Sequence, residues 1–363
     1  MKKKKICFIA QFPPPIHGLA KAVDTLYKSN LSREFDFEKV NITDNKQFLK
    51  NLAHILRSKA DTFYFTISQT RGGNVRDLLI MRLLIMKRKK CIIHLHGGYY
   101  RKLVDTSLPK IFKKINYRTI SELDGAIVLS NSLKSVFYNM IENEKIFVVP
   151  NCIDNEFLIA NEEFELKMKS VTEKKVFHIL YLSNFIKSKG YPEVLELARL
   201  EKERIEKGGE RRLHFDFGGK FFEERDKDYF LNYIRRYNLE KYVTYHGVVE
   251  GEQKRELLRN SDIFILLTRY SNEGQPISIL EAMGNGMMVI TTDHAGIPDV
   301  VKDKVNGMLC TLDIKIEDIY TYIYTMDPKG MQSFMINNRN KIKKEFNEAK
   351  YIENMKKIFD ITK

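Results

Sequence analysis

Residues 271–284 of this 363-residue chain read SNEGQPISILEAMG. They follow an apolar run that is typical of a buried strand, and a second such run comes directly after them. Pro276 suits the first position of a helix, where its missing N–H costs nothing, and Gly284 suits the helix end. The stretch therefore predicts a strand–loop–helix–strand unit, with Glu273 in the loop and Glu281 on the helix.

The start of this helix is a predicted anion-binding site. Backbone N–H groups near Gln275 and Ile277 would point at a bound anion, and the helix dipole would favour it. A loop carboxylate, an anion-binding helix start and a second carboxylate suit a sugar nucleotide. Glu273 would bind sugar hydroxyls, the helix start would bind phosphates, and Glu281 would bind the ribose. The alternative is an ordinary capped helix with surface carboxylates.

The same alternation of short apolar runs and amphipathic stretches continues along the chain, and it predicts parallel sheets covered by helices. In the first half we expect strands at 5–10, 35–40, 62–67, 91–95, 125–129 and 146–149. In the second half we expect them at 177–182, 214–217, 243–246, 263–267 and 287–291.

A charged stretch at 160–175 has no clear strand, and we place a linker there. The predicted organisation is an N-terminal domain at 1–165, a C-terminal domain at 176–345, and a last helix at 346–363 that packs back on the N-terminal domain. This helix carries apolar residues at helical spacing, namely Tyr351, Met355, Ile358 and Phe359.

The charge is strongly basic and unevenly spread. The net charge is +14, and residues 82–118 hold eleven Lys or Arg residues against one acid, Asp105. Basic residues interleaved with Leu, Ile, Phe and Tyr suit an anionic membrane surface. A solvated basic face and a nucleic-acid site are the alternatives. We expect the membrane surface, and no nucleic-acid partner.

Several other classes of protein lack support in the sequence. The apolar runs near the N-terminus and at 78–86 are too short for a signal peptide or a membrane span. Four scattered cysteines indicate reduced thiols in a cytoplasmic protein, peripheral at most on the inner face of the cell membrane. Asp226 and Asp228 form a D-x-D string that looks like a solvated helix start, so we expect no metal site. Phosphate-loop and dinucleotide-binding glycine motifs are absent from the sequence.

The glutamates at 273 and 281 stand in the pattern E-G-x-P-x-x-x-x-E-A-M-x-x-G, which includes Gly274 and Pro276. This pattern resembles the signature of family-4 retaining glycosyltransferases of the GT-B fold. Five more stretches resemble motifs of that family in the same order: FPPPIHG at 12–18, HLHG at 94–97, VVPNCID at 148–154, KSKG at 187–190 and GIPDVV at 296–301. The resemblance implies an α/β fold with two Rossmann-like domains that face each other across a cleft holding the donor.

The resemblance also implies roles for single residues. Lys189 corresponds to a lysine that pairs with the donor diphosphate, and His96 to the active-site histidine on the acceptor side. Gly18 would let the backbone approach the donor closely. Asn184 stands where the family usually has an arginine, and Arg269 is our candidate for the missing cation.

Asn151 belongs to the stretch that ends the N-terminal domain in this family, and we include it among the substrate-binding residues. Leu19, Cys152 and Asp299 depart from the family pattern, where two glycines and a glutamate are usual.

The expected activity is transfer of a sugar from a nucleotide diphosphate sugar to an acceptor hydroxyl, with retention of configuration and without a metal or other cofactor. A UDP-sugar is the first candidate donor and a GDP-sugar the second, and the acceptor would be a sugar or a lipid-linked sugar in bacterial polysaccharide or glycolipid assembly. Two alternatives remain: an epimerase-like enzyme on the same fold, and a basic surface-binding protein with a degenerate transferase site.

Overall fold

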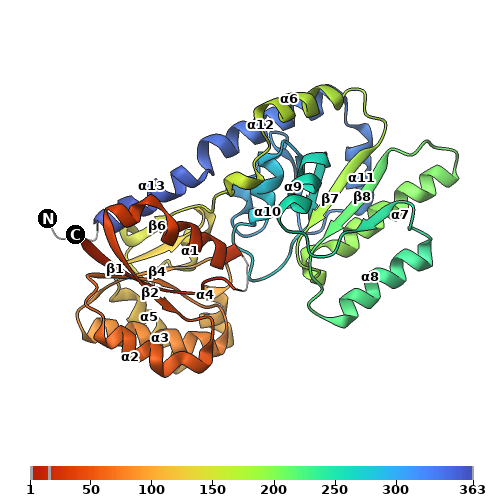
Figure 1. The fold of residues 1–363 in the computed structure, drawn as a ribbon. Helices are drawn as coiled ribbons and strands as arrows, with labels where there is room; N and C mark the ends of the chain where they lie inside the picture. Colours follow the sequence, from red (N-terminus) through yellow and green to blue (C-terminus); the bar gives the residue numbers. More distant parts are fainter. Residues whose placement is uncertain (1–2, 15–17, 362–363) are drawn as a thin grey trace. The chain divides into compact units, whose positions relative to one another are not determined.

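The computed structural model of the chain describes residues 3–14 and 18–361. The chain folds into two compact units, shown in Figure 1. The first unit consists of Met1–Cys152, Ser271–Gln275 and Glu348–Lys363. The second consists of Ile153–Tyr270 and Pro276–Asn347. The chain therefore changes unit within the stretch SNEGQPISILEAMG, between Gln275 and Pro276.

The first unit contains a six-stranded parallel sheet with the order β2-β1-β3-β4-β5-β6. Its strands are β1 (Lys4–Ala10), β2 (Phe35–Asn41), β3 (Thr62–Thr66), β4 (Lys90–His94), β5 (Gly125–Val128) and β6 (Ile146–Val148). β3 and β5 are buried along their whole length, as expected for a parallel sheet with both faces covered.

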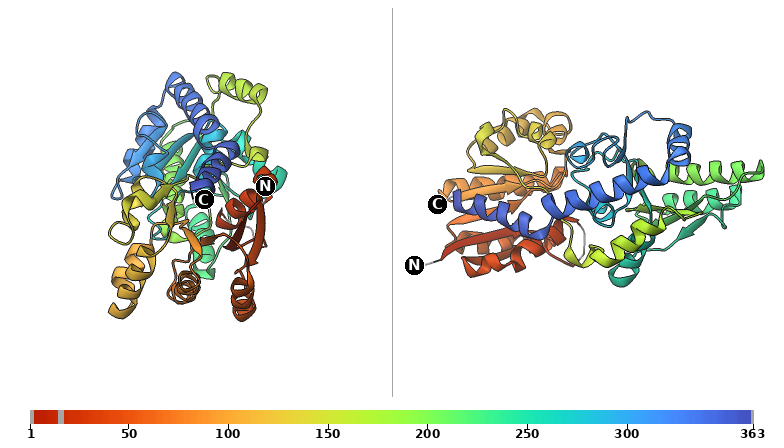
Figure 2. Two further views of the ribbon diagram at one scale, coloured as in Figure 1. Left: turned by 90° about the vertical axis from the view of Figure 1, so that its left-hand side faces the viewer. Right: turned by 90° about the horizontal axis from the view of Figure 1, so that it is seen from above.

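Helices cover both faces of this sheet. On one side lie α1 (Gly18–Lys28) and α13 (Glu348–Ile361), and on the other lie α2 (Phe48–Arg57), α3 (Arg71–Met86) and α5 (Lys110–Ser121), as Figure 1 shows. A short helix, α4 (Tyr100–Lys102), follows the loop after β4. The view from above in Figure 2 shows α13 lying over the sheet.

The core of the first unit depends on this last helix. Its apolar face buries Tyr351, Met355, Ile358 and Phe359, the residues that the sequence pattern singled out. The ring of Phe359 packs against the rings of Phe8, Phe35 and Tyr64, with centroid separations of 6.0, 5.8 and 6.1 Å. Residues from the two ends of the sequence therefore share one aromatic cluster.

The second unit also contains a six-stranded parallel sheet, with the order β12-β11-β10-β7-β8-β9. Its strands are β7 (Phe177–Leu182), β8 (Leu213–Gly218), β9 (Val243–Tyr245), β10 (Ile263–Leu266), β11 (Met288–Thr292) and β12 (Gly307–Cys310). Its helices are α6 (Asn161–Ser170), α7 (Tyr191–Glu206), α8 (Glu224–Tyr237), α9 (Gly251–Asn260), α10 (Ile277–Gly284), α11 (Ile316–Thr325) and α12 (Pro328–Glu345).

The structure differs from the sequence-based expectation at the boundary between the halves. The charged stretch at 160–175 was expected to be a linker, but it contains α6, which belongs to the second unit. Phe164 of this helix is 6% exposed and lies under the guanidinium group of Arg339, 4.5 Å from the ring centre. Lys167 Nζ donates to the carbonyl of Asn285 at 2.9 Å, and burial lowers the pKa of Lys167 to about 8.

The sequence reading also missed β12. This strand has four residues and begins at Gly307, whose φ is +140°. A Cβ atom there would lie 2.0 Å from the carbonyl oxygen of Val289, so glycine is required where β12 pairs with β11.

Replacing Phe359 with alanine should destabilise the first unit. Phe359 is 0% exposed, and removing a buried aromatic ring costs about 3–5 kcal/mol. Chemical denaturation followed by circular dichroism measures the change. Ile361 is the matched control on the same helix, because it is 64% exposed and its replacement by alanine should change stability by less than about 0.5 kcal/mol. Equal effects of F359A and I361A would contradict the packing described here.

Candidate functional site

The residues singled out in the second unit lie where neighbouring strands end. The loops at 183–190, 267–270 and 293–299 follow the carboxyl ends of β7, β10 and β11, which are adjacent in the sheet. In open α/β sheets, ligands bind beyond these ends. The loops therefore bring Lys189, Arg269 and their neighbours to one edge of the second sheet.

Lys189 lies on a short 3-10 turn, Lys187–Lys189, between β7 and α7. Gly190 ends the turn with a φ of +87°, and a Cβ atom there would lie 2.7 Å from the carbonyl oxygen of Leu267. The turn thus packs directly on the backbone of the loop after β10. The Lys189 ammonium group lies 5.1 Å from the centre of the Tyr270 ring, so its position is tied to the same loop.

Arg269 has a structural partner. Its backbone N–H donates to the carbonyl of Ser188 at 2.6 Å, and its guanidinium group forms an ion pair with Glu193 of α7 and donates to the carbonyl of Leu312. We suggested Arg269 as a substitute for the arginine that the family usually has at position 184. The carboxylate of Glu193 already balances the positive charge of Arg269. Asn184, which stands at the usual arginine position, is exposed.

Glu281 is held by a lysine that the sequence analysis did not identify. Its side chain on α10 is buried, and Lys254 of α9 places its ammonium nitrogen 2.6 Å from Oε1. The same ammonium group lies 4.1 Å from the centre of the Phe157 ring. Lys254 thus balances and orients a carboxylate that would be costly to bury alone. The sequence gives no sign that Lys254 pairs with Glu281, because the two helices come together only when the chain folds.

The helix that carries Glu281 begins one residue later than expected. α10 starts at Ile277, and Pro276 occupies the N-cap position with a ψ of 120° rather than the first helical position. The N–H groups of the first turn have no carbonyl partner four residues earlier within the helix. The N–H of Ile279 already donates to the Pro276 carbonyl at 3.2 Å, so the anion-site prediction relies on the N–H groups of Ile277 and Ser278.

In the first unit, β4 leads into the histidine loop. His94 is fully buried, and its Nδ1 lies 2.6 Å from the hydroxyl oxygen of Tyr64. Burial and the neighbouring His96 hold the pKa of His94 well below its ordinary value, so the ring is neutral. The ring of His96 lies 4.0 Å from that of His94 and is partly exposed. His94 thus supports His96 from the core.

The loop at 271–275 packs against this histidine loop at two glycines. A Cβ atom on Gly97 would lie 2.5 Å from the carbonyl oxygen of Asn272, and one on Gly274 would lie 2.5 Å from the carbonyl oxygen of His96. Neither position tolerates a side chain without a shift of backbone. Glu273, between these two contacts, is 8% exposed, and its neighbour Gly274 packs on the backbone of His96.

Asn151 and Gln275 hold the same loop in place. The backbone N–H of Asn151 donates to Gln275 Oε1 at 2.7 Å, and its side-chain amide donates to the Gln275 carbonyl at 2.9 Å. The Gln275 amide donates in turn to the carbonyl of Leu129 at 3.3 Å. Their amide groups thus fasten the loop at 271–275 to the segments that follow β5 and β6. Contact of both residues with substrate stays a prediction.

Two further residues that the sequence did not reveal support the histidine loop. Gln69 Oε1 accepts a hydrogen bond from the backbone N–H of Tyr99 at 2.6 Å. One residue earlier, the backbone N–H of Ser68 donates to Asp77 at 2.6 Å. Burial raises the pKa of Asp77 to about 6, although Arg76 opposes the shift. These contacts link the loop after β3 to the loop after β4.

Gly18 is exposed and is the first residue of α1, consistent with a loop-to-helix position. Residues 15–17 of the FPPPIHG stretch lie outside the described residues. We expected the D-x-D string to be a solvated helix start, and the structure differs at its first residue. Asp226 is 7% exposed, and its Oδ1 accepts a hydrogen bond from the Tyr191 hydroxyl at 2.8 Å.

Each unit therefore presents a distinct set of groups. The second unit offers an ammonium group at the strand edge, a helix start with backbone donors, and a buried carboxylate, which together suit a nucleoside diphosphate. The first unit offers an imidazole and a carboxylate, His96 and Glu273, on two loops in contact. These are groups that can bind and orient sugar hydroxyls.

The chain is similar to known glycosyltransferases. Residues 162–326 match the family described as Glycosyl transferases group 1. The UDP-Gal:alpha-D-GlcNAc-diphosphoundecaprenol alpha-1,3-galactosyltransferase of Escherichia coli is 26% identical over 74% of this chain and 68% of its own length. An uncharacterized 41.2 kDa protein in the cps region of Klebsiella pneumoniae is 22% identical over 86% of this chain and 90% of its own.

Among solved structures, HepE of Anabaena in complex with UDP superposes with a TM-score of 0.76 at 15% identity, over 98% of this chain and 99% of that one. That similarity concerns the fold, and the sequence matches concern the family. Residues 162–326 thus belong to the group 1 glycosyltransferases, and the chain is a glycosyltransferase with the GT-B fold.

Proposed function

We propose that the chain transfers a sugar, with retention of its anomeric configuration, from a UDP-sugar to a lipid-linked sugar acceptor in the assembly of a cell-surface polysaccharide or glycolipid. The observation that carries this proposal is the placement of Lys189, the start of α10 and Glu281 within one unit, with Glu281 oriented by Lys254. UDP is the preferred nucleotide because HepE, whose fold is similar, was solved with UDP.

The proposed roles follow from the charge that develops during transfer. The bond between the anomeric carbon and the diphosphate oxygen breaks, and its electron pair leaves with the diphosphate. Lys189 and the first N–H groups of α10 stabilise that growing negative charge, and they need no metal ion for this role. Glu281 accepts hydrogen bonds from the ribose hydroxyls, which fixes the nucleoside.

Glu273 and His96 act at the sugar. Glu273 accepts hydrogen bonds from hydroxyls of the transferred sugar, and His96 lies on the acceptor side. The acceptor oxygen forms the new bond to the anomeric carbon, and resemblance to the family implies that the departing diphosphate takes the acceptor proton on the same face. Gly97 and Gly274 act indirectly, because they allow the two loops to touch.

The acceptor class is proposed from relatives and from charge. The E. coli relative is named for a diphosphoundecaprenol-linked acceptor, and the Klebsiella relative for the cps region. A lipid-linked acceptor requires contact with a membrane surface. In the described part of the chain, no helix combines the length and hydrophobicity that crossing a membrane would need. Surface binding is therefore the form of contact we propose.

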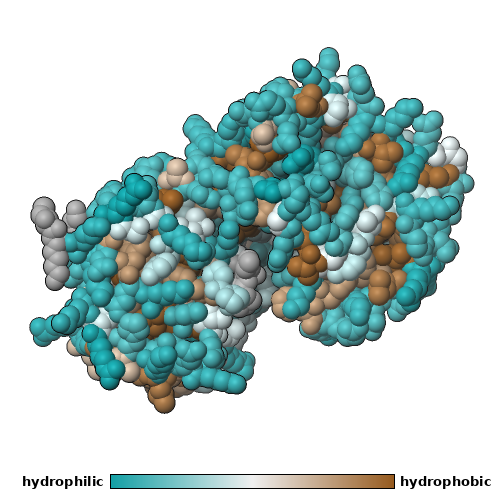
Figure 3. All heavy atoms as spheres, in the orientation of Figure 1, coloured by the Kyte–Doolittle hydropathy of each residue, from teal (hydrophilic) through white to brown (hydrophobic). Residues whose placement is uncertain are grey.

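Helices α3 and α5 of the first unit provide a suitable surface. Leu79 and Met86 on α3 are 55% and 70% exposed, and Ile111 on α5 is 60% exposed. Glu122 joins the two helices, because it forms ion pairs with Arg82 at 2.9 Å and with Arg118 at 3.4 Å. The drawn face of the molecule is otherwise largely hydrophilic, with small apolar areas (Figure 3). Exposed apolar side chains set among lysines are typical of interfacial helices.

Replacing Glu281 with alanine should weaken UDP binding about 10- to 100-fold, because a hydrogen bond to a charged group contributes about 1.5–3 kcal/mol. Thermal stabilisation by UDP, GDP, ADP and CMP measures binding, since a ligand of the native state raises the melting temperature. Glu256→Ala is the matched control, because Glu256 is an exposed carboxylate on α9. Donor KM should rise more than kcat falls in E281A.

If no nucleotide stabilises the wild-type protein, the degenerate-site alternative replaces the proposal. If the donor is converted in the absence of any acceptor, an epimerase-like activity replaces it.

Replacing Lys189 with alanine should lower kcat about 10²- to 10³-fold, because the fixed cation acts mainly on charge that develops in the transition state. The measurement is steady-state transfer from a UDP-sugar to a synthetic lipid-linked acceptor. Lys187→Ala is the matched control, since Lys187 is an exposed lysine in the same turn. Similar losses in K187A and K189A would remove the assigned role.

Membrane binding should depend on the basic face of α5. Lys110, Lys114 and Arg118 are exposed and spaced four residues apart. Replacing all three with glutamine should weaken binding to anionic vesicles about 100-fold, at about 1 kcal/mol per charge. Vesicle sedimentation at rising salt measures this. A control triple variant of exposed second-unit lysines, Lys207, Lys241 and Lys329, should bind normally. Equal binding to neutral vesicles would refute the electrostatic surface.

A further inference from the structure

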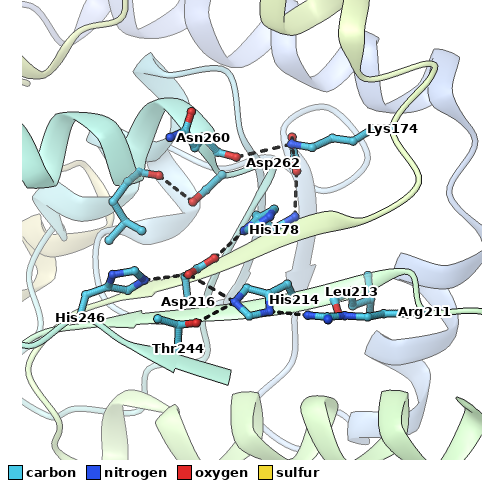
Figure 4. A network of polar contacts seen from close by, with 12 residues as sticks. Lys174, His178, Arg211, Leu213, His214, Asp216, Thr244, His246, Asn260 and Asp262 are labelled. Carbon is cyan, nitrogen blue, oxygen red and sulfur yellow. Dashed lines mark hydrogen bonds and ion pairs between the residues drawn. The ribbon is translucent and has the colours of Figure 1, made fainter. Parts of the chain in front are cut away.

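Three histidines of the second unit converge on one buried aspartate, away from the strand ends described above. His178 lies on β7, His214 and Asp216 lie on β8, and His246 directly follows β9 (Figure 4). The Asp216 side chain is 7% exposed, and the three imidazole side chains are between 15% and 40% exposed. The cluster thus has a buried centre and a solvent-accessible rim.

The register of the sheet brings these residues to one face. His178 pairs with His214, and Asp216 pairs with Thr244 across β8 and β9. Side chains two residues apart on a strand share a face, so His214 and Asp216 lie beside His178 and near the residue two positions after Thr244, which is His246. His178 and His214 are the second residues of their strands, so they lie near the opposite end from Lys189.

The polar atoms are close enough to share one ion. His178 Nδ1 lies 2.7 Å from one Asp216 oxygen, and His246 Nε2 lies 2.7 Å from the other. His214 Nε2 lies 3.7 Å from the same oxygen as His246. The ligand atoms of His178, His214 and Asp216 all lie within 4.8 Å of one another. With bonds of about 2.0–2.2 Å, the ligand atoms of a tetrahedral ion lie about 3.3–3.6 Å apart, so the two 2.7 Å contacts must widen when an ion enters.

A divalent cation binds an ionised carboxylate and unprotonated imidazole nitrogens. The nitrogens of His178 and His246 that face Asp216 therefore carry no proton when the ion is bound. Asp262 fixes the backbone of His178. Its carboxylate accepts a hydrogen bond from the His178 N–H at 2.8 Å and forms an ion pair with Lys174 at 2.6 Å.

We propose that His178, His214, Asp216 and His246 bind one divalent transition-metal ion of the zinc class. Three imidazole nitrogens and a carboxylate form a four-ligand set that Zn²⁺ prefers, and the hard oxygen-only sets of Mg²⁺ and Ca²⁺ differ from it. The bound ion links β7, β8 and the segment after β9, and so stabilises this edge of the second sheet. It takes no part in sugar transfer.

Two neighbouring groups contact the His214 ring where an ion would bind. Thr244 Oγ1 lies 2.9 Å from Nε2 and must give way to the ion, and Arg211 gives the proposal a specific signature. The Arg211 guanidinium group lies 2.6 Å from His214 Nδ1. When His214 Nε2 binds metal, Nδ1 carries the ring proton, so this contact must break. Arg211 is exposed and can turn into solvent. Removing it also removes a positive charge from the site.

The test uses the full chain without an affinity tag, stripped of metal by a chelator. Titration with Zn²⁺ against a chromophoric chelator should show one equivalent bound with a Kd below about 10 µM, and Co²⁺ should give the visible absorption of a four-coordinate site. Zn²⁺ should raise the melting temperature. His178→Ala and His246→Gln should each weaken binding about 100-fold, and Arg211→Ala should tighten it several-fold.

His54→Gln is the matched control, because His54 Nε2 also lies 2.7 Å from a carboxylate, that of Glu38, but without other histidines. Circular dichroism in the presence of chelator shows whether each variant is folded. His246→Gln keeps the test valid if His178→Ala fails to fold, because His246 lies outside the strand. Absence of binding by the wild type, or binding unchanged in H178A and H246Q, would overturn the proposal.

Discussion

The hydrogen bonds between Asn151 and Gln275 are the constraint on which the candidate site depends. They fasten a five-residue loop, Ser271–Gln275, to the first unit, although the residues on either side of it belong to the second. Glycine contacts then set the loop against His96. Without this clamp, Glu273 would lie on a loop with no fixed relation to the imidazole. The specificity of the local geometry therefore comes from backbone and amide groups, and not from the charged residues themselves.

Much of the fold followed from the alternation of apolar runs, because a strand buried on both faces leaves an uninterrupted apolar segment. The strands around β4 and β10 were predicted nearly to the residue. α6 was missed because glutamates and lysines dominate its sequence, and Phe164 is its one buried residue. β12 was missed because a short edge strand that begins with glycine has almost no apolar pattern. Both depend on tertiary contacts that no local window contains.

The site could be predicted where chemistry is local in sequence. The spacing of Glu273 and Glu281, and the position of Lys189 before Gly190, can be recognised in the sequence alone. The partners that orient these residues cannot be recognised there. Lys254 reaches Glu281 from another helix, Glu193 compensates the charge of Arg269, and Gln69 supports the histidine loop from the loop after β3. The histidine cluster is the extreme case, because its members come from two strands and from the residue after a third, and only the sheet register brings them together.

The aromatic cluster around Phe359 has a consequence for biosynthesis. The first unit begins to emerge from the ribosome early, yet its core lacks α13 until residues 348–363 are made. Translation at roughly 5–20 residues per second separates the two events by on the order of 10–40 s. During that interval Phe8, Phe35 and Tyr64 have no cover from the helix, so the nascent chain exposes an apolar surface that a chaperone can bind. The second unit consists of residues 153–347 apart from the short loop at 271–275, so all of its segments are made before α13. It can therefore complete its core first.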